Sequence, residues 1–290
     1  MASFSQWVAA ARLRTLPMAI APVVVGSAAA AQLGSFHLGK ALLALIVALA
    51  LQIGVNYSND YSDGIRGTDD HRVGPFRITG SGASAHATVR NMAFTFYGVA
   101  AVAGLALTLW ANAWWLILVG VAAIVAAWYY TGGKRPYGYR AMGEVFVFIF
   151  FGLVATLGTT AAIAGGVTLS AVSGAIAIGL FACGVLMANN IRDIPTDREA
   201  GKTTLAVLLG DSMARAAYIV LVAAPFVMLM GPIVDGHPAT VITVLALVLV
   251  LHPVRIVVSG ATGHELIPTI KSTSLTALAF SVLLALGIAL

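Results

Sequence analysis

The sequence predicts an all-α, polytopic membrane protein, and both its composition and the length of its apolar runs predict this class. Of its 290 residues, 60% are hydrophobic and only 9% are charged, whereas about 25% of a soluble domain is charged. The mean hydropathy is +0.95. The apolar runs reach the roughly 20 residues that cross about 30 Å of hydrocarbon as a helix. We therefore expect a single transmembrane domain over residues 1–290.

Nine apolar segments are expected to form the helices of this bundle. In order, they cover residues 16–34, 40–58, 91–111, 113–131, 144–165, 169–190, 215–233, 239–257 and 272–290. The first segment follows Arg14 without a small-residue cleavage site, so it is expected to stay in the protein and not to be removed as a signal peptide. Trp114 marks a membrane interface at the start of the fourth segment, and Pro253 predicts a kink in the eighth.

The distribution of basic residues predicts which side of the membrane each loop faces. With the N-terminus in the cytoplasm, all of the 16 Lys and Arg residues except Lys40 lie on the cytoplasmic side, as basic residues in membrane proteins tend to do. We expect an external C-terminus and a cytoplasmic active site capped by loops at residues 59–90, 132–143 and 191–214. Membrane topology and anionic lipid account for the pI of about 9.6, so no nucleic-acid partner is expected.

Two acidic motifs at the ends of apolar segments are the strongest candidates for a functional site. The first contains Asn56, Asn59, Asp60 and Asp63, and the second contains Asn189, Arg192, Asp193 and Asp197. Spacings of three and four residues place Asn56 with Asp60 and Asp63, and Asn189 with Asp193 and Asp197, on one helix face each. Carboxylates near hydrocarbon are costly unless a cation neutralises them. Oxygen ligands suit Mg²⁺, so the motifs predict a divalent metal held against an anionic substrate.

Basic residues and glycines follow both motifs, where an anionic ligand would meet them. Arg66 and Arg72 alternate with Asp69 and other acids after the first motif, and Lys202 follows the second. Arginine pairs well with phosphate oxygens, and glycine lets the backbone approach a ligand. The alternative is a solvated linker whose charges neutralise one another. Residues 203–209 predict a short amphipathic helix over the site.

Tyr130 and Lys134 lie one helical turn apart at the end of the fourth segment. A hydroxyl and an ammonium group at this spacing can both reach one diphosphate. The alternative is ordinary interfacial chemistry, because aromatic and lysine side chains are common at helix ends. The two acidic motifs tip the balance towards diphosphate binding. Glu144 remains open between a supporting acid and an interfacial charge, and Arg14 between a carboxylate partner and, more simply, a positive anchor.

These runs resemble the motifs of a known family. An Asn-Asp-x-x-Asp run ends at Asp63, a Tyr-x-x-x-Lys run ends at Lys134, and an Asp-x-x-x-Asp run ends at Asp197. Together they are similar to the motifs of the intramembrane aromatic prenyltransferases of the UbiA superfamily, and the resemblance covers the whole chain. The superfamily often has a further Asp where this chain has Gly67, with Asp69 displaced beyond it. The departure leaves the third carboxylate ligand open.

Three shorter runs resemble one branch of that superfamily. Arg14-Thr-Leu-Pro17, Arg72-Val-Gly-Pro75 and the run over residues 204–210 are similar to the branch that prenylates 1,4-dihydroxy-2-naphthoate on the way to menaquinone, particularly its actinobacterial members. The resemblance implies a polyprenyl diphosphate as donor and 1,4-dihydroxy-2-naphthoate as acceptor, in a bacterial cell membrane.

The resemblance also implies a mechanism and roles for particular residues. Two Mg²⁺ ions would be held by Asp60 with Asp63 and by Asp193 with Asp197, and Asp69 is a further candidate ligand. Catalytic roles are implied for these four acids, Tyr130 and Lys134, and substrate-binding roles for Asn56, Asn59, Arg66, Arg72, Asn189, Arg192, Lys202 and Arg14. Loss of diphosphate would give an allylic cation that the naphthalene ring attacks, and the carboxyl group would leave as CO₂, giving a demethylmenaquinone.

Alternatives remain open at this stage. Another enzyme of the superfamily would use 4-hydroxybenzoate, a chlorin or haem as its acceptor. A transporter would place ionisable residues near the middle of the membrane, whereas here they gather on one side. A non-catalytic prenyl-lipid binding protein would not need two complete acidic motifs. The sequence indicates neither the isoprenoid length nor the residues of the acceptor pocket.

Overall fold

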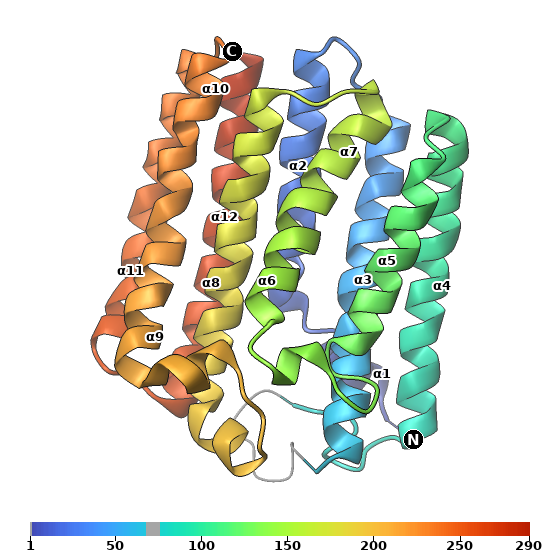
Figure 1. Cartoon of the computed structure of the whole chain (residues 1–290), viewed down its shortest axis with the longest axis vertical. Coiled ribbons are helices and arrows are strands. Elements are labelled where there is room, and N and C mark those ends of the chain that lie inside the picture. The colour runs from blue at the N-terminus through green and yellow to red at the C-terminus, as the bar shows by residue number, and fades with distance from the viewer. Residues whose placement is uncertain (1, 68–75) are drawn as a thin grey trace.

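The computed structural model describes residues 2–67 and 76–290, and within these ranges the chain is a bundle of helices without a strand. An isolated parallel bridge joins Arg140 to Thr203. Figure 1 shows the helices side by side along the long axis, with the two termini at opposite ends of the bundle. The predicted all-α class is confirmed.

The helices follow one another in the order of the predicted segments. The longer ones are α2 (Pro17–Gln32), α3 (Leu38–Ile65), α4 (His86–Ala111), α5 (Trp115–Tyr129), α8 (Leu169–Glu199), α9 (Leu205–Ala223), α11 (Leu247–Val258) and α12 (Ile267–Ala289). The shorter ones are α1 (Phe4–Ala10), α6 (Gly143–Val147), α7 (Ala155–Ala164) and α10 (Met230–Val234). Five 3₁₀ turns lie at Leu13–Thr15, Tyr137–Tyr139, Ala224–Leu229, Pro238–Ala246 and Gly263–Leu266, and a π-helical segment covers Phe148–Val154.

Length and hydropathy identify the membrane-spanning segments. In the described part of the chain, seven are long and apolar enough to cross a membrane, and α1 with α2 make an eighth if this pair, bent by 49°, counts as one span. Helix α5 is apolar but has only 15 residues, about 22 Å at 1.5 Å per residue. The chain is therefore a multi-pass membrane protein, and the count of nine spans remains a prediction.

The outer surface of the bundle suits lipid. Large apolar side chains such as Val102 on α4, Leu118 on α5 and Val248 on α11 are exposed. An exposed apolar surface of this extent marks contact with a membrane or a partner. The charged residues lie mainly at the end of the bundle that carries the N-terminus, where the ends of α3 and α8 also lie (Figure 1).

Helix α8 is the central element, and it packs against α2, α9, α12 and the π-helical segment. The contact between α8 and the π-helical segment needs a glycine on each of the two helices. A Cβ atom added to Gly152 would lie 2.5 Å from the Cα atom of Gly179 on α8, closer than any side chain tolerates. Small residues let helix backbones approach in this way within membranes. The π-helical segment is therefore held directly against α8.

The acidic motifs lie within helices, so the predicted start of both long loops was wrong. Helix α3 continues to Ile65 and α8 to Glu199, whereas loops were expected from residues 59 and 191. The helices continue because the polar side chains of the motifs are buried and pair with protein groups. The short helix expected at residues 203–209 matches the start of α9 at Leu205, which breaks from the rest of that helix at Gly210 with φ 74°.

Candidate functional site

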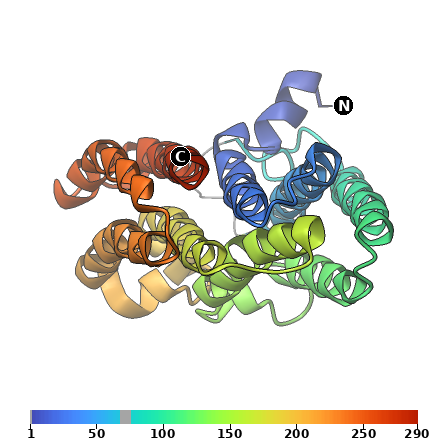
Figure 2. The ribbon, with the colours of Figure 1, turned by 90° about the horizontal axis from the view of Figure 1, so that it is seen from above.

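A cavity of about 330 Å³ lies between α2, α3, α5, α8 and the segment that contains α7. Figure 2 shows these helices grouped around one region of the bundle. The lining of the cavity is polar at one end and apolar towards the other. The polar end includes Arg14, Asn59, Asp63, Arg77, Arg192 and Lys202, and the apolar part includes Val23, Val47, Leu107, Leu116, Val119 and Val154.

One face of α3 supplies a continuous wall of this cavity. Residues that line it recur every three or four positions, namely Ala44, Val47, Ala48, Leu51, Gln52, Val55, Asn56, Asn59 and Asp63. This is the spacing of one helix face. The face is apolar along most of its length and becomes polar from Gln52 onwards, so it runs from the hydrocarbon part of the cavity to its charged end.

Asp60 does not belong to the face that lines the cavity. Its side chain is fully buried, and its carboxylate accepts hydrogen bonds from the backbone N–H groups of Ile78 and Thr79, each 3.0 Å long. Asn59 takes its place at the cavity and accepts a hydrogen bond from Thr131. The expectation that Asn56, Asp60 and Asp63 share the working face is thus corrected to Asn56, Asn59 and Asp63. The segment after the first motif captures Asp60, a tertiary contact that spacing alone does not indicate.

Asp63 stands at the charged end of the cavity with two partners. Tyr139 donates a hydrogen bond of 2.8 Å to Oδ1, and the Arg77 guanidinium lies 3.6 Å from Oδ2. Both partners come from segments expected to cap the site, although neither residue was itself selected from the sequence. The Asp63 carboxylate is therefore already compensated by one charge and one hydrogen bond.

The second motif contains two further ion pairs. Arg192 and Asp193 form a bidentate pair with two distances of 2.7 Å, and both side chains are buried. Asp197 lies 3.3 Å from the Lys202 ammonium group. Arg192 and Lys202 line the cavity, whereas Asp193 and Asp197 are not among its lining residues. The bases of this motif face the cavity, and its acids hold them there.

Tyr139 connects the two motifs. Its hydroxyl bonds to Asp63 on α3, and its ring lies under the Lys202 ammonium group, with 5.3 Å between that nitrogen and the ring centroid. Lys202 pairs in turn with Asp197 of α8. A cation over an aromatic face is stabilised electrostatically. These contacts join the two motifs through a tyrosine that the sequence analysis did not select.

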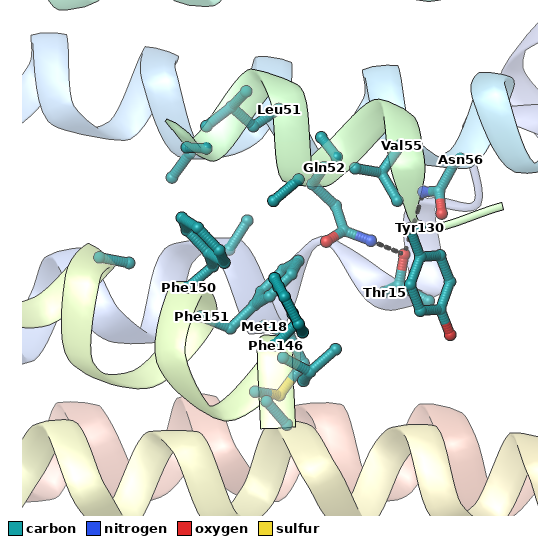
Figure 3. A pocket seen from close by; sticks show the side chains of 18 of the residues that line it. Thr15, Met18, Leu51, Gln52, Val55, Asn56, Tyr130, Phe146, Phe150 and Phe151 are labelled. Carbon is teal, nitrogen blue, oxygen red and sulfur yellow. Dashed lines mark hydrogen bonds between the residues drawn. The ribbon is translucent and has the colours of Figure 1, made fainter. Parts of the chain in front are cut away.

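Tyr130 and Lys134 are placed differently. Tyr130 lines the cavity (Figure 3), where its hydroxyl can donate a hydrogen bond. Lys134 is exposed and does not line the cavity. The pairing expected from their spacing does not form, because α5 ends at Tyr129 and the chain turns through Gly133 at φ 75°. Lys202 supplies the ammonium group at the cavity instead.

The remaining predicted residues divide into three groups. Arg14, Asn56 and Asn189 line the cavity. Arg66 does not, because its guanidinium donates to the backbone carbonyls of Thr131 and Gly133 and so braces the turn after α5. Asp69 and Arg72 lie outside the described residues. The predictions for these last two stay predictions.

An aromatic wall adjoins the charged end, and the sequence analysis missed it. Phe146, Phe150 and Phe151 line the cavity beside Tyr130 (Figure 3), and Phe146 stacks on Tyr137 with 4.0 Å between ring centroids. The π-helical segment has a wider turn than an α-helix, which keeps residues spaced by four on the cavity side. The signal was available in the sequence, because residues 146–151 contain four phenylalanines in a helix that carries few charges.

The carboxylate oxygens of the two acidic motifs are the candidate ligands for a divalent metal. Among residues 2–67 and 76–290, no group of three or more His, Cys, Asp or Glu side chains is positioned to hold a metal ion. The acids instead pair with Arg77, Arg192 and Lys202. An all-oxygen set nevertheless has the chemistry that Mg²⁺ prefers. Because these bases are already engaged by carboxylates, a bound diphosphate would compete with the acids for them unless metal cations entered with it. The residues fit a metal that binds together with an anionic substrate.

The chain is similar to known proteins over most of its length. A model of the UbiA prenyltransferase family matches residues 19–266. The chain is 51% identical over 285 residues to a Mycobacterium tuberculosis protein named 1,4-dihydroxy-2-naphthoate octaprenyltransferase, with 98% of this chain and 97% of the relative covered. It is 40% identical over 216 residues to an Escherichia coli protein of the same name, with 72% and 70% covered.

Solved structures show the same fold at much lower sequence identity. A UbiA homolog from Aeropyrum pernix K1 matches with a TM-score of 0.70 at 20% identity, with 96% of this chain and 98% of that chain covered. A UbiA homolog from Archaeoglobus fulgidus bound to GPP and Mg²⁺ matches with a TM-score of 0.68 at 16% identity, with 96% and 99% covered.

Proposed function

Because the chain belongs to the UbiA prenyltransferase family, we propose that it transfers a long-chain isoprenyl group from a polyprenyl diphosphate to 1,4-dihydroxy-2-naphthoate. Diphosphate and CO₂ are released, and a demethylmenaquinone is formed. Relatives with this named activity match almost the full chain. The observation that carries the proposal is one cavity whose charged end continues into an apolar channel, because this is the shape of an isoprenyl diphosphate.

The charged end of the cavity would hold the diphosphate. Arg77, Arg192 and Lys202 line this end as cations, and Tyr130 adds a hydroxyl donor. Guanidinium groups match phosphate oxygens with paired hydrogen bonds. As the allylic C–O bond breaks, its electron pair leaves with the diphosphate, and these fixed donors stabilise the growing negative charge.

The apolar part would hold the isoprenyl chain and protect the allylic cation. Phe146, Phe150 and Phe151 line the cavity, and the face of an aromatic ring stabilises a nearby cation. The surrounding apolar walls exclude water, which would otherwise capture the cation. The distal units of a long polyprenyl chain would extend from the cavity between helices into lipid.

Mg²⁺ is proposed as the cofactor, with Asp63 and Asp197 as its first candidate ligands. Asp63 pairs with Arg77 and Asp197 pairs with Lys202, and a bound diphosphate would attract both of these bases. When bound, Mg²⁺ supplies positive charge to the leaving diphosphate. Asp193 forms a bidentate pair with Arg192, so we propose that it positions Arg192. Asp60 accepts hydrogen bonds from two backbone N–H groups, so we propose that it positions the segment at Thr79.

The active site and the N-terminus are proposed to face the cytoplasm, with the C-terminus outside. The termini lie at opposite ends of the bundle, and the charged end of the cavity lies towards the end that carries the N-terminus (Figure 1). Basic residues are concentrated at this end, as the positive-inside rule requires of a cytoplasmic face.

The test is an assay of the purified protein in detergent or vesicles with Mg²⁺, octaprenyl diphosphate and one aromatic acid. Mass spectrometry should detect a prenylated naphthalene product without its carboxyl group. In a competition between 1,4-dihydroxy-2-naphthoate and 4-hydroxybenzoate at equal concentration, the naphthoate should be consumed first. Preference for the benzoate, or a product that keeps its carboxyl group, would contradict the acceptor while leaving the family assignment intact.

A transporter is the alternative from another class, and the position of the charged residues argues against it. The charged side chains that line the cavity lie at one end, and the rest of its wall is apolar. A transport path needs polar groups near the middle of the membrane.

A further inference from the structure

Buried polar atoms on several cavity-lining residues have no hydrogen-bond partner in the described part of the chain. Besides Nη1 of Arg192, a cation assigned above to the diphosphate, they include Nη2 of Arg12, a donor, and Oε1 of Gln52, an acceptor. Buried polar atoms are nearly always paired, and leaving one unpaired costs free energy. One unpaired donor and one unpaired acceptor in the same cavity indicate a ligand that offers both an anionic acceptor and a donor.

Thr15 brings these two residues together. Its hydroxyl donates to the Arg12 carbonyl over 2.9 Å and accepts from the Gln52 amide nitrogen over 3.0 Å. Asn56 donates to the same hydroxyl over 3.3 Å. Because the Thr15 proton is committed to Arg12, Gln52 must present its nitrogen to Thr15, and its oxygen is left for another partner. Figure 3 shows the Gln52 nitrogen turned towards Thr15 and the oxygen turned away from it.

The backbone at Arg12 supports a specific role for this side chain. Arg12 has φ 54° and ψ 58°, a left-handed conformation that residues other than glycine seldom adopt. Asn112 and Ala141 are the other non-glycine residues with positive φ in the described ranges, and neither lines the cavity. Such conformations gather at functional sites, where surrounding structure holds them. Here the turn between α1 and α2 directs Arg12 to the cavity.

We propose that Arg12 and Gln52 form the subsite for the aromatic acceptor, an inference that rests on the proposed function. Arg12 would bind the carboxylate, because a guanidinium group matches its geometry. Gln52 would accept a hydrogen bond from the hydroxyl on the neighbouring ring carbon. In 1,4-dihydroxy-2-naphthoate these two groups are adjacent, whereas 4-hydroxybenzoate carries them on opposite sides of its ring. The benzoate can therefore make only one of the two contacts.

The subsite is separate from the cations assigned to the diphosphate. Arg77, Arg192 and Lys202 pair with acids of the two motifs, whereas Arg12 and Gln52 are joined through Thr15 at the start of α2. Substitutions in the subsite should therefore act on the acceptor and leave the prenyl diphosphate unaffected.

The experiment compares Arg12→Ala and Gln52→Leu with the wild type, using three acceptor-like probes. We would measure KM for 1,4-dihydroxy-2-naphthoate and for octaprenyl diphosphate. Inhibition constants would be measured for 1,4-dihydroxynaphthalene, which lacks the carboxylate, and 2-naphthoate, which lacks the hydroxyls. Arg90→Ala is the matched control, because Arg90 is exposed and does not line the cavity.

Arg12→Ala should raise the naphthoate KM about 10-fold or more, the range for loss of a charge-assisted hydrogen bond. It should raise the inhibition constant of 2-naphthoate by a similar factor. The inhibition constant of 1,4-dihydroxynaphthalene and the KM for octaprenyl diphosphate should stay within about 2-fold of the wild-type values. Gln52→Leu should show the reverse selectivity between the two probes. Arg12→Lys, which keeps the charge, should recover part of the naphthoate affinity.

Other outcomes overturn the inference. If Arg12→Ala raises the KM for octaprenyl diphosphate and spares the naphthoate, Arg12 belongs to the diphosphate site. If it weakens both naphthalene probes equally, its role is structural. Naphthoate binding to the wild type would also be measured by calorimetry. A wild type that neither binds nor prenylates the naphthoate overturns the proposed function together with this subsite, whereas an active wild type with an unchanged Arg12→Ala variant overturns the subsite alone.

Discussion

The Asp60→Asn variant tests whether Asp60 holds the segment at Ile78 and Thr79 in place or takes part in catalysis. The Asp60 carboxylate accepts hydrogen bonds from the N–H groups of Ile78 and Thr79. An Asn side chain keeps one acceptor oxygen and turns an NH₂ group towards the second N–H. Loss of one charge-assisted bond costs about 1.5–3 kcal/mol, and removal of a buried charge offsets part of this cost. We expect a net destabilisation of about 2 kcal/mol.

The protein carries its own probe for this measurement. Cys183 is the only cysteine and is buried, so a thiol-reactive dye reports unfolding in detergent. A loss of about 2 kcal/mol should lower the Tm by roughly 4–8 °C, and hydrogen exchange at Ile78 and Thr79 should accelerate. Asp63→Asn is the matched comparison, because Asn can still accept from Tyr139. It should lose activity with a smaller change in Tm.

The result that refutes this reasoning is specific. If Asp60→Asn keeps its Tm and the protection of Ile78 and Thr79 but loses turnover, Asp60 acts on the substrate or its metal and does not anchor the segment. If Asp63→Asn is the less stable and the more active of the two variants, the assignment of the cavity face of α3 is wrong.

Three further predictions follow from other parts of the molecule. EDTA should abolish turnover and Mg²⁺ should restore it, since Arg77, Arg192 and Lys202 are each engaged by a carboxylate and a diphosphate brings further negative charge; full activity in metal-free buffer would exclude the proposed cofactor. Asp235 accepts hydrogen bonds from Gln32 and Ser170, which lower its pKa. The wild type should therefore be more stable than Asp235→Ala at pH 7. This difference in stability should shrink as the pH falls below about 4, because the carboxylate becomes protonated in both folded and unfolded chains. An equal difference in Tm at pH 7 and pH 3 would contradict this. A reporter fused after Leu290 should behave as external, and a cytoplasmic signal there would contradict the proposed orientation.

Apolar runs were sufficient to predict the class of fold and the order of its helices, because a helix is one of the few structures that satisfies its backbone within lipid. They were not sufficient to predict where α3 and α8 end. Charge at Asp60 and Asp193 suggested exit from the membrane, yet both side chains are buried with partners. Helix boundaries here depend on tertiary pairing, which local hydropathy does not contain.

The candidate site was predictable to the level of motifs, and its contacts were not. The spacing of Tyr130 and Lys134 assumed a continuing helix, and the turn at Gly133 removes Lys134 from the cavity. Tyr139 joins the two motifs from a 3₁₀ turn, where no periodic pattern marks it. Arg12 was counted only as a basic residue of the N-terminal segment, because its unusual backbone conformation is visible only in the folded chain.

The π-helical segment at Phe148–Val154 makes chain length a determinant of the cavity wall. An α-helix rotates by about 100° per residue. Deletion of one residue would convert the π-helical segment to α-helix. The part of the helix that precedes the segment would then rotate by about 100° relative to α7. Phe146 would leave the cavity while Gly152 remained seated on Gly179. Substitutions can therefore change the size of the aromatic wall gradually, whereas its orientation can change only by a discrete insertion or deletion. Homologues that differ in length at this segment should differ abruptly in the acceptors and chain lengths they use.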